Sequence, residues 1–210
     1  FSGVDGGLLT IGEPEADLLF DLLIQSAFTK VHAQTMYDTF VQHTGDGLLE
    51  EETFLEAIEE LVTMTNATQQ MQDSEFLDTM LMIFRCFLPE NCAKVDAFEI
   101  AAGFSLFAWG SKSDKLASSF HYFDVDSKGF LNRQQLWRFL RSVLITLLYL
   151  SPPEENVVKR YGSIAELVDT GEQELMDSIM DGLEEDNAEA ADTRNPDTRT
   201  KIFTFEEFGE

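Results

Sequence analysis

Apolar residues recur at helical spacing along most of the chain, and polar segments separate the apolar sets. Phe54, Ala57, Ile58 and Leu61 stand at positions i, i+3, i+4 and i+7, which lie on one face of an α-helix. Similar apolar sets flank the polar segments "LPENCAKVDAFE" and "DVDSKGFLNRQQ". The pattern predicts an all-α protein made of amphipathic helices joined by polar loops.

The polar segments recur with a regular spacing and share an internal order. Two of them begin at Leu88 and Asp124, a separation typical of supersecondary repeats such as the tetratricopeptide and ankyrin types. Those repeats do not account for a polar insert in which a glycine is followed by a lone apolar residue. The helix–loop–helix calcium-binding unit does, because its twelve-residue loop needs a glycine at position six for a sharp turn.

The segment 124–135 fits that loop best. Asp124 and Asp126 stand at positions one and three, where side-chain oxygens bind the ion, and Gly129 stands at position six. Phe130 follows at position seven, which supplies its backbone carbonyl, and Leu131 at position eight is the apolar residue that pairs with a neighbouring loop. This register is the most specific signal in the sequence.

The same loop departs from the calcium-binding pattern at two positions. Lys128 occupies position five, and we expect its ammonium to turn outward, away from an ion. Gln135 replaces the usual bidentate glutamate at position twelve, and Asn132 at position nine adds only a neutral oxygen. With two carboxylates left, the sequence predicts weak calcium binding, on the order of 10⁻⁴ M or poorer. The alternative is a metal-free loop held by its own hydrogen bonds.

On these residues the chain resembles the EF-hand superfamily, in particular four-hand sensors such as the neuronal calcium sensors, calcineurin B and calaxin. Three stretches carry the resemblance: "GDGLLEEETFLEAI", "FEIAAGFSLFAWGS" and "KLASSFHYFDVDSKGFLNRQQLWRFL". It implies two pairs of EF-hand helix–loop–helix units with short antiparallel strands between the loops, and an N-terminal helix near residues 15–28. The expected division is an extension over 1–29, an N-terminal pair over 30–110 and a C-terminal pair over 111–210.

Within each pair, the resemblance predicts pairing of Leu49 with Val95 and of Leu131 with Phe203. The first two loops, 42–53 and 88–99, are expected to be degenerate. The first keeps one carboxylate at a ligand position, and the second keeps only Glu99, at position twelve. We therefore predict that neither loop binds calcium.

The fourth loop is predicted to be expanded, over 184–207. Its candidate ligands are Glu184, Asp186 and Glu207, and a polar insert, "AEAADTRNPDTRT", lies between the second and the third of these. The sequence does not establish whether a residue of the insert folds back toward an ion.

Charge and cysteine content narrow the range of partners. Acidic residues outnumber basic ones 39 to 14, for a formal charge of −25. Nucleic acids and anionic membranes are therefore poor partners, whereas cations or a basic helix fit.

The longest apolar run, over 143–150, is too short to cross a bilayer, which predicts no transmembrane segment. We interpret Cys86 and Cys92 as buried thiols in a reducing, cytoplasmic setting. Both ends of the sequence look cut from a longer protein.

The segment 136–150 is apolar on more than one face. Its large residues either pack on the other pair of hands or line a groove for an amphipathic, basic partner helix, and we favour the groove. The candidate partner-binding residues are Trp137, Phe139, Leu144, Leu147 and Leu148.

No catalytic constellation, phosphate-binding loop or cofactor motif stands out, so we do not expect an enzyme. The sequence predicts a calcium-binding regulatory protein. Two alternatives stay open: a calcium-independent EF-hand scaffold or adaptor, and a regulatory module of a larger protein. The Asp124–Asp126 pair and Glu207 favour the sensor, whereas Lys128 and Gln135 favour the scaffold.

Overall fold

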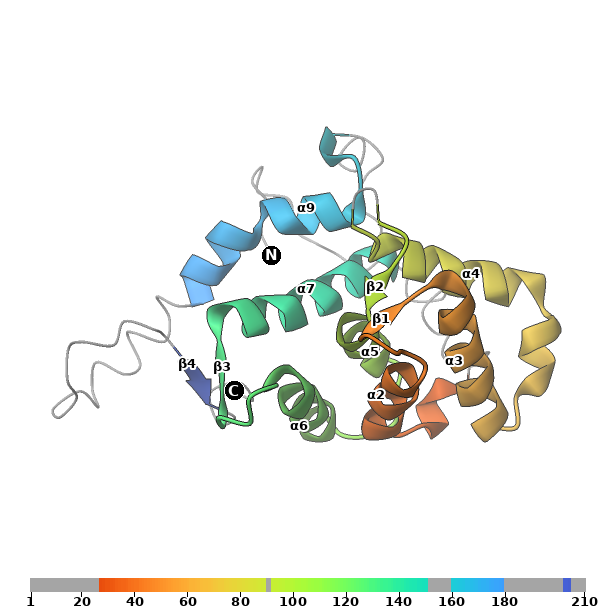
Figure 1. Ribbon diagram of the computed structural model, residues 1–210. Helices are drawn as coiled ribbons and strands as arrows, with labels where there is room; N and C mark the ends of the chain where they lie inside the picture. The colour runs from red at the N-terminus through yellow and green to blue at the C-terminus, as the bar shows by residue number, and fades with distance from the viewer. Residues whose placement is uncertain (1–26, 90–91, 151–159, 180–201, 205–210) are drawn as a thin grey trace, which may run out of the picture.

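The computed structural model describes residues 27–89, 92–150, 160–179 and 202–204 (Figure 1). These residues are mostly helical, with two short antiparallel two-stranded sheets, as the all-α EF-hand prediction requires. In chain order the elements are η1 (Phe28–Lys30), α2 (Ala33–Gln42), β1 (Leu48–Leu49), α3 (Glu51–Met64), η2 (Thr68–Gln72), α4 (Ser74–Cys86), β2 (Val95–Asp96), α5 (Ala97–Ser105), α6 (Lys112–Phe123), β3 (Phe130–Asn132), α7 (Arg133–Leu150), α9 (Ile164–Thr170) and β4 (Ile202–Thr204). Residues 172–179 are also helical.

The first two hands pair through their loops. β1 follows α2, β2 follows α4, and the two strands are antiparallel with Leu49 opposite Val95, as predicted. Both side chains are buried. Gly47 has a φ of +83°, which is the left-handed turn that position six demands. A Cβ there would meet no atom within 4 Å, so the glycine serves the backbone conformation and not the space around it.

The third loop pairs in the same way with the chain's last described strand. β3 and β4 are antiparallel and place Leu131 opposite Phe203, which confirms the second predicted register. Gly129 has a φ of +76° and matches Gly47 in the first loop. Most of the expected N-terminal helix near 15–28, and the fourth-loop candidates Glu184, Asp186 and Glu207, lie outside the described residues.

Aromatic rings fill the interior of the N-terminal pair. Phe54 lies at the centre, with ring centroids 5.9 Å from Phe40, 4.9 Å from Phe84 and 5.7 Å from Phe104. All four side chains are fully buried. They come from α3, α2, α4 and α5 in turn, so each helix of the pair contributes one ring to the same cluster. Such edge-to-face and offset pairs add to the free energy gained by burial.

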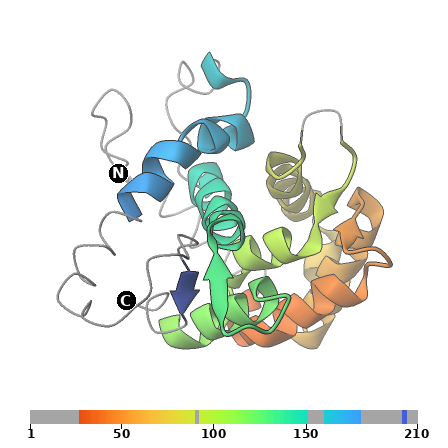
Figure 2. The same cartoon turned by 60° about the vertical axis from the view of Figure 1, so that its left-hand side comes forward.

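The N-terminal pair of hands and helix α7 of the third hand pack closely against each other. Helix α7 lies between α5 and α9 in both views (Figures 1 and 2). A Cβ added at Gly103 of α5 would stand 2.8 Å from Phe87 Cζ and 3.3 Å from the Ser142 carbonyl of α7, and would overlap the hydroxyl of Thr146. Only glycine lets the two backbones approach this closely.

A second contact joins α2 to α6. The rings of Tyr37 and Tyr122 stack, with centroids 4.6 Å apart. The Tyr37 hydroxyl donates to Ser119 Oγ at 2.9 Å, and the Tyr122 hydroxyl donates to Asp38 and accepts from Gln34 at 2.8 Å. Burial raises the pKa of Tyr37 far above its ordinary value, so the hydroxyl stays neutral. Both helices of the third hand, α6 and α7, are thus attached to the N-terminal pair.

The two cysteines differ from the sequence prediction. Cys86 is half-buried, and burial raises the pKa of its thiol to about 11. Cys92 is exposed, so its predicted burial is wrong: it lies in the loop before β2, which does not pack it against the core. Among the described helices, none combines the length and the apolar content needed to span a bilayer.

Candidate functional site

The third loop holds its first acidic residue in place without a metal. Asp124 is the C-cap of α6 and is only 8% exposed. Its Oδ1 accepts the amide of Lys128 at 2.9 Å, and its Oδ2 accepts the amide of Gly129 at 2.7 Å. The amide of Ser127 donates to the Asp124 carbonyl at 2.9 Å. The loop therefore folds back over its position-one carboxylate, and Ser127 adopts a φ of +50° to allow it.

Positions three and five form an ion pair with each other. Lys128 Nζ lies 2.6 Å from Asp126 Oδ2, and both side chains are about half exposed. Lys128 is exposed and pairs with the carboxylate two residues away, and its outward turn from a bound ion stays a prediction. An exposed pair of this kind contributes little to stability. An ion binding here would have to displace the ammonium from Asp126.

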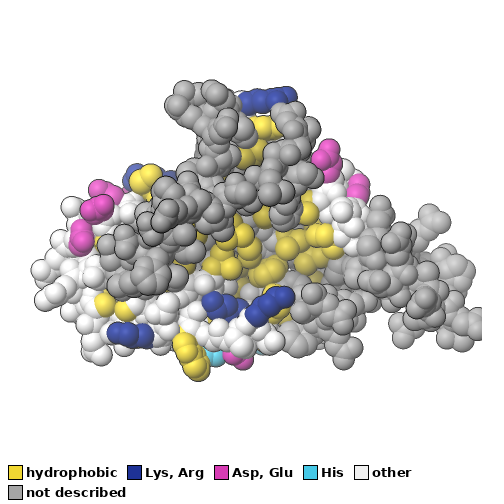
Figure 3. Space-filling view, turned by 180° about the vertical axis from the view of Figure 1, so that it is seen from behind, with side chains coloured by type: hydrophobic (Ala, Val, Ile, Leu, Met, Phe, Trp, Pro, Cys, Tyr) yellow, Lys and Arg dark blue, Asp and Glu magenta, His cyan; other side chains and the backbone are white. Residues whose placement is uncertain are grey.

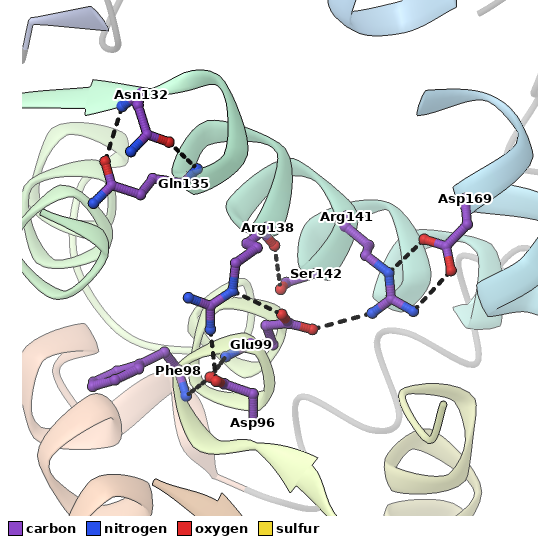
Figure 4. Close-up of polar contacts among 9 residues, drawn as sticks. All are labelled: Asp96, Phe98, Glu99, Asn132, Gln135, Arg138, Arg141, Ser142 and Asp169. Carbon is purple, nitrogen blue, oxygen red and sulfur yellow. Dashed lines mark hydrogen bonds and ion pairs between the residues drawn. The ribbon is translucent and has the colours of Figure 1, made fainter. Parts of the chain in front are cut away.

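Positions nine and twelve cap the next helix reciprocally (Figure 4). The amide of Asn132 donates to Gln135 Oε1, and the amide of Gln135 donates to Asn132 Oδ1, both at 2.9 Å. This arrangement satisfies amides at the start of α7 that have no partner within the helix. It also places both neutral candidate ligands at the carboxyl end of the loop, beside the Phe130 backbone in β3.

The donor chemistry of the third loop fits the ligand type that calcium takes. Asp124, Asp126, the Phe130 carbonyl, Asn132 and Gln135 offer oxygen atoms, the ligand type that calcium prefers. Two of them are carboxylates, and nowhere in the described residues do three or more His, Cys, Asp or Glu side chains gather as a metal cluster. The low ligand charge is consistent with weak binding.

The first loop neutralises its acidic residues with a lysine from the second. Lys94 Nζ lies 3.0 Å from Glu50 and 3.7 Å from Asp46. These carboxylates raise the pKa of Lys94, and the largest cause is the hydrogen bond that Lys94 donates to Glu50. Asp46 Oδ1 also accepts the amide of Leu48 at 3.1 Å. The acidic side chains at positions five and nine of this loop, Asp46 and Glu50, are thus engaged within the protein.

The second loop engages its acidic residues with arginines from the third hand (Figure 4). Arg138 Nη2 lies 2.6 Å from Asp96 Oδ2, and Arg138 Nε lies 3.0 Å from Glu99 Oε1. Arg141 Nη1 lies 3.1 Å from Glu99 Oε2, and Arg141 Nε reaches Asp169 of α9 at 2.6 Å. Each oxygen of Glu99 therefore accepts from a different arginine. We call these five residues the arginine network.

The centre of the arginine network is screened from solvent. The side chains of Glu99 and Arg141 are 14% and 12% exposed. Burial raises the pKa of the Glu99 carboxyl, and the hydrogen bond from Arg138 and the charge of Arg141 oppose this rise. For Arg141, burial lowers the pKa while Asp169 and Glu99 raise it, and the net direction is upward.

The sequence prediction did not include this network. The available signal was the placement of Arg138 and Arg141 three residues apart within the apolar run of α7, where a charged residue needs a buried partner. Residues three apart lie on the same side of a helix. Only the packing of α7 on α5 shows that their partner is Glu99.

The candidate partner-binding residues on α7 divide into two groups. Trp137 and Phe139 are buried, at 6% and 8% exposure, and belong to the core. Leu144, Leu147 and Leu148 are half-buried. Figure 3 shows hydrophobic side chains gathered at the centre of one face of the molecule, with Lys and Arg side chains nearby.

Comparison with known proteins gives a partial match. No family model matches the chain. The chain is 30% identical to calaxin of Homo sapiens over 82 residues, and 27% identical to calaxin of Xenopus laevis over the same length. Each alignment covers 38% of this chain and 39% of the relative, so the chain spans well under half the length of the curated relatives it matches. Together with the loop pairing, this similarity suggests the EF-hand superfamily.

Proposed function

We propose that this chain is a calcium-binding regulatory EF-hand protein whose third loop is its calcium site. The ion would be held by Asp124, Asp126, the Phe130 carbonyl, Asn132 and Gln135. Its charge would draw these oxygens together at the start of α7. The weak affinity follows from the two carboxylates and from the competing ammonium of Lys128. The similarity to calaxin supports a calcium-sensing role and not an enzymatic one.

The observation that carries the proposal is the state of Asp124. A carboxylate that is 8% exposed and held by two backbone amides is already positioned for an ion at position one of the loop. Preorganisation of this kind lowers the ordering cost of binding. Neither loop of the N-terminal pair offers a comparable carboxylate at its first position, where Gln42 and Leu88 stand.

We further propose that a basic amphipathic helix, from another protein or from a longer parent chain, binds beside α7. The half-buried leucines Leu144, Leu147 and Leu148 would meet its apolar face, and the net charge of −25 would favour its basic residues. Trp137 and Phe139 could join such a contact only if α7 shifted, since both are buried. Opening of a hand on calcium binding is the kind of change that exposes such residues.

A second candidate function is a scaffold that binds its partner without calcium. The ion pair between Lys128 and Asp126 favours it, because the protein supplies its own cation within the loop. The capping bond of Gln135 also favours it, since Oε1 is already in use.

Calorimetric titration with calcium tests the proposed site. The wild-type chain should release or take up heat that saturates in the range of about 10⁻⁴ to 10⁻³ M. Asp124→Ala should abolish this heat, whereas Asp46→Ala, the matched change in the first loop, should leave it unchanged. Absence of heat in the wild-type chain, or its persistence in Asp124→Ala, would rule out the third loop as the site.

A fluorescent basic amphipathic peptide separates the two functions. Fluorescence anisotropy would be measured with calcium and with a chelator. Binding only with calcium supports the regulatory sensor, and equal binding in both conditions supports the scaffold. No binding in either condition would contradict the proposed partner.

A further inference from the structure

In the second hand, the carboxylates near the end of the loop are bound by cationic side chains of the protein itself. In the loop register, Asp96 and Glu99 stand at positions nine and twelve, and position twelve is where a calcium-binding hand places its bidentate carboxylate. Here both Glu99 oxygens bond guanidinium groups, at 3.0 Å to Arg138 and 3.1 Å to Arg141. Arginine is suited to this task because its planar donors match a carboxylate geometrically and it is always charged.

The residues on the two sides of this contact come from the exit helices of two different hands. Glu99 lies in the first turn of α5, the exit helix of the second hand, and Asp96 caps that helix by accepting two amides. Arg138 and Arg141 lie one and two turns beyond Gln135 on α7, the exit helix of the third hand. The two exit helices are therefore tied together just beyond their loops.

This tie opposes the movement that calcium binding requires. In a calcium-responsive hand the position-twelve residue moves toward the ion and its helix moves with it. In the third hand that residue is Gln135 at the start of α7. Movement of α7 away from α5 would leave the Glu99 carboxylate, only 14% exposed, without its two partners. An incompletely solvated, unpaired charge is strongly unfavourable.

We propose that the arginine network is a lock between the second and third hands. In this lock, Arg138 and Arg141 replace calcium as the cationic partners of the second loop, and they lower the calcium affinity of the third hand. The effect on the calcium affinity of the third hand rests on the proposed calcium site, whereas the role of the two arginines at the second hand rests on the geometry alone. Weakening the lock strengthens calcium binding, and by thermodynamic reciprocity calcium loosens the lock.

A charge-conserving substitution tests the lock. Glu99→Asp keeps the charge but shortens the side chain by one methylene, so that the carboxylate no longer reaches both arginines. We expect about fivefold tighter calcium binding by calorimetry, within the range of ordinary coupling between sites. Because the net charge is unchanged, long-range attraction for calcium does not explain such a gain. Glu51→Asp is the matched control, because Glu51 pairs with Arg85 at 2.9 Å within the N-terminal pair. The calcium affinity of the Glu51→Asp variant should equal that of the wild type.

Hydrogen exchange supplies a readout that does not need calcium. In the metal-free protein, amides of α7 over 138–146 should exchange faster in Glu99→Asp than in the wild type or in Glu51→Asp. The double variant Arg138→Lys/Arg141→Lys gives an independent test, since lysine keeps the charge but lacks the donor geometry. Its control is Arg133→Lys, whose arginine bonds Asp177 at 2.9 Å and does not reach α5.

The outcomes separate the lock from the calcium site. Faster exchange together with tighter calcium binding in both lock variants supports the whole inference. Faster exchange with calcium affinity unchanged or weaker overturns the coupling. Exchange equal to the wild type in both variants overturns the lock itself. If no variant binds calcium, the proposed function fails, and the exchange rates alone decide whether the lock exists.

Discussion

The second and third loops have lost opposite halves of the calcium-binding pattern. The third keeps its first carboxylate, Asp124, buried and held by two amides, but ends in the neutral Gln135. The second begins with Leu88 and keeps its last carboxylate, Glu99, which two arginines bind. A hand binds calcium tightly when carboxylates stand at both ends of its loop, because the first ligand anchors the ion and the last one moves the exit helix.

The comparison shows how a loop remains folded after its pattern is lost. In the second hand the exit helix is held from outside, by side chains of another hand. In the third hand the side-chain bonds that hold the loop are local, between residues within five positions of each other. The second loop, which is held by side chains of another hand, restrains the position of that hand. The third loop, which is held by its own side chains, stays available to bind an ion.

The largest expected effect concerns the contact between the exit helices of these two hands. Gly103→Ala places a new Cβ against Phe87 and the α7 backbone, and the close packing of α5 and α7 leaves no room for this atom. We expect a loss of about 2 kcal/mol in the free energy of unfolding, measured by chemical denaturation. The control is Gly171→Ala, where the new Cβ meets only a carbonyl at 3.5 Å and the change should be small. Equal losses in both variants would contradict the close approach of α5 and α7.

Completing the third loop should have the next largest effect. Gln135→Glu restores a carboxylate at position twelve and raises the ligand charge, so calcium should bind about tenfold more tightly, which equals about 1.4 kcal/mol. Thr53→Glu makes the same change at position twelve of the first loop, where Lys94 already engages Asp46. Calorimetry should detect no added calcium binding in that variant. A gain in both variants would remove the distinction between the two loops.

The loop glycines offer a smaller, paired effect. Gly47→Ala and Gly129→Ala each force an L-residue into the left-handed region, at φ of +83° and +76°. Neither new Cβ meets an atom within 4 Å, so only the backbone cost of about 1 kcal/mol applies in both. Thermal or chemical unfolding should show similar losses for the two. A loss of several kcal/mol in one variant would contradict the equivalence of the two turns.

The smallest effect is a dependence on pH at Glu99. Burial raises the pKa of this carboxyl in the folded state, so its contribution to stability is full below its ordinary pKa and is lost as pH rises through the folded value. Glu99→Gln does not titrate and keeps an oxygen acceptor for the arginines. The unfolding free energy of Glu99→Gln should therefore rise relative to that of the wild type between about pH 4 and pH 7. A difference that is constant over this range, or of opposite sign, would contradict the raised pKa.

The sequence was sufficient to predict the pairing of the hands. In the EF-hand pattern position eight of each loop is an apolar residue that pairs with the neighbouring loop, and this placed Leu49 opposite Val95 and Leu131 opposite Phe203. Such local rules act within a few residues, so a pattern along the chain expresses them. The same holds for the buried helix faces, since their spacing follows directly from the helical period.

Side-chain partnerships across the fold were not predictable in the same way. The pairing of Lys128 with Asp126 was not predicted, because the choice of rotamer depends on the nearest acceptor. The arginine network depends on which helices meet after folding, as Glu99 and Arg138 come from different hands. The burial of Trp137 and Phe139 likewise follows from the packing of the helices into one core and not from the period of α7.

The most direct test of the calcium site is a calcium titration followed by amide NMR at two glycines. The Gly129 amide donates to Asp124 Oδ2 at 2.7 Å, whereas the Gly47 amide donates to Thr44 Oγ1 at 3.2 Å. An ion bound to Asp124 would polarise the first bond and leave the second unchanged. We predict a saturable shift of the Gly129 signal and a stationary Gly47 signal. A Gly129 signal that does not move up to about 10 mM calcium, well above the weakest affinities of such loops, would contradict the account.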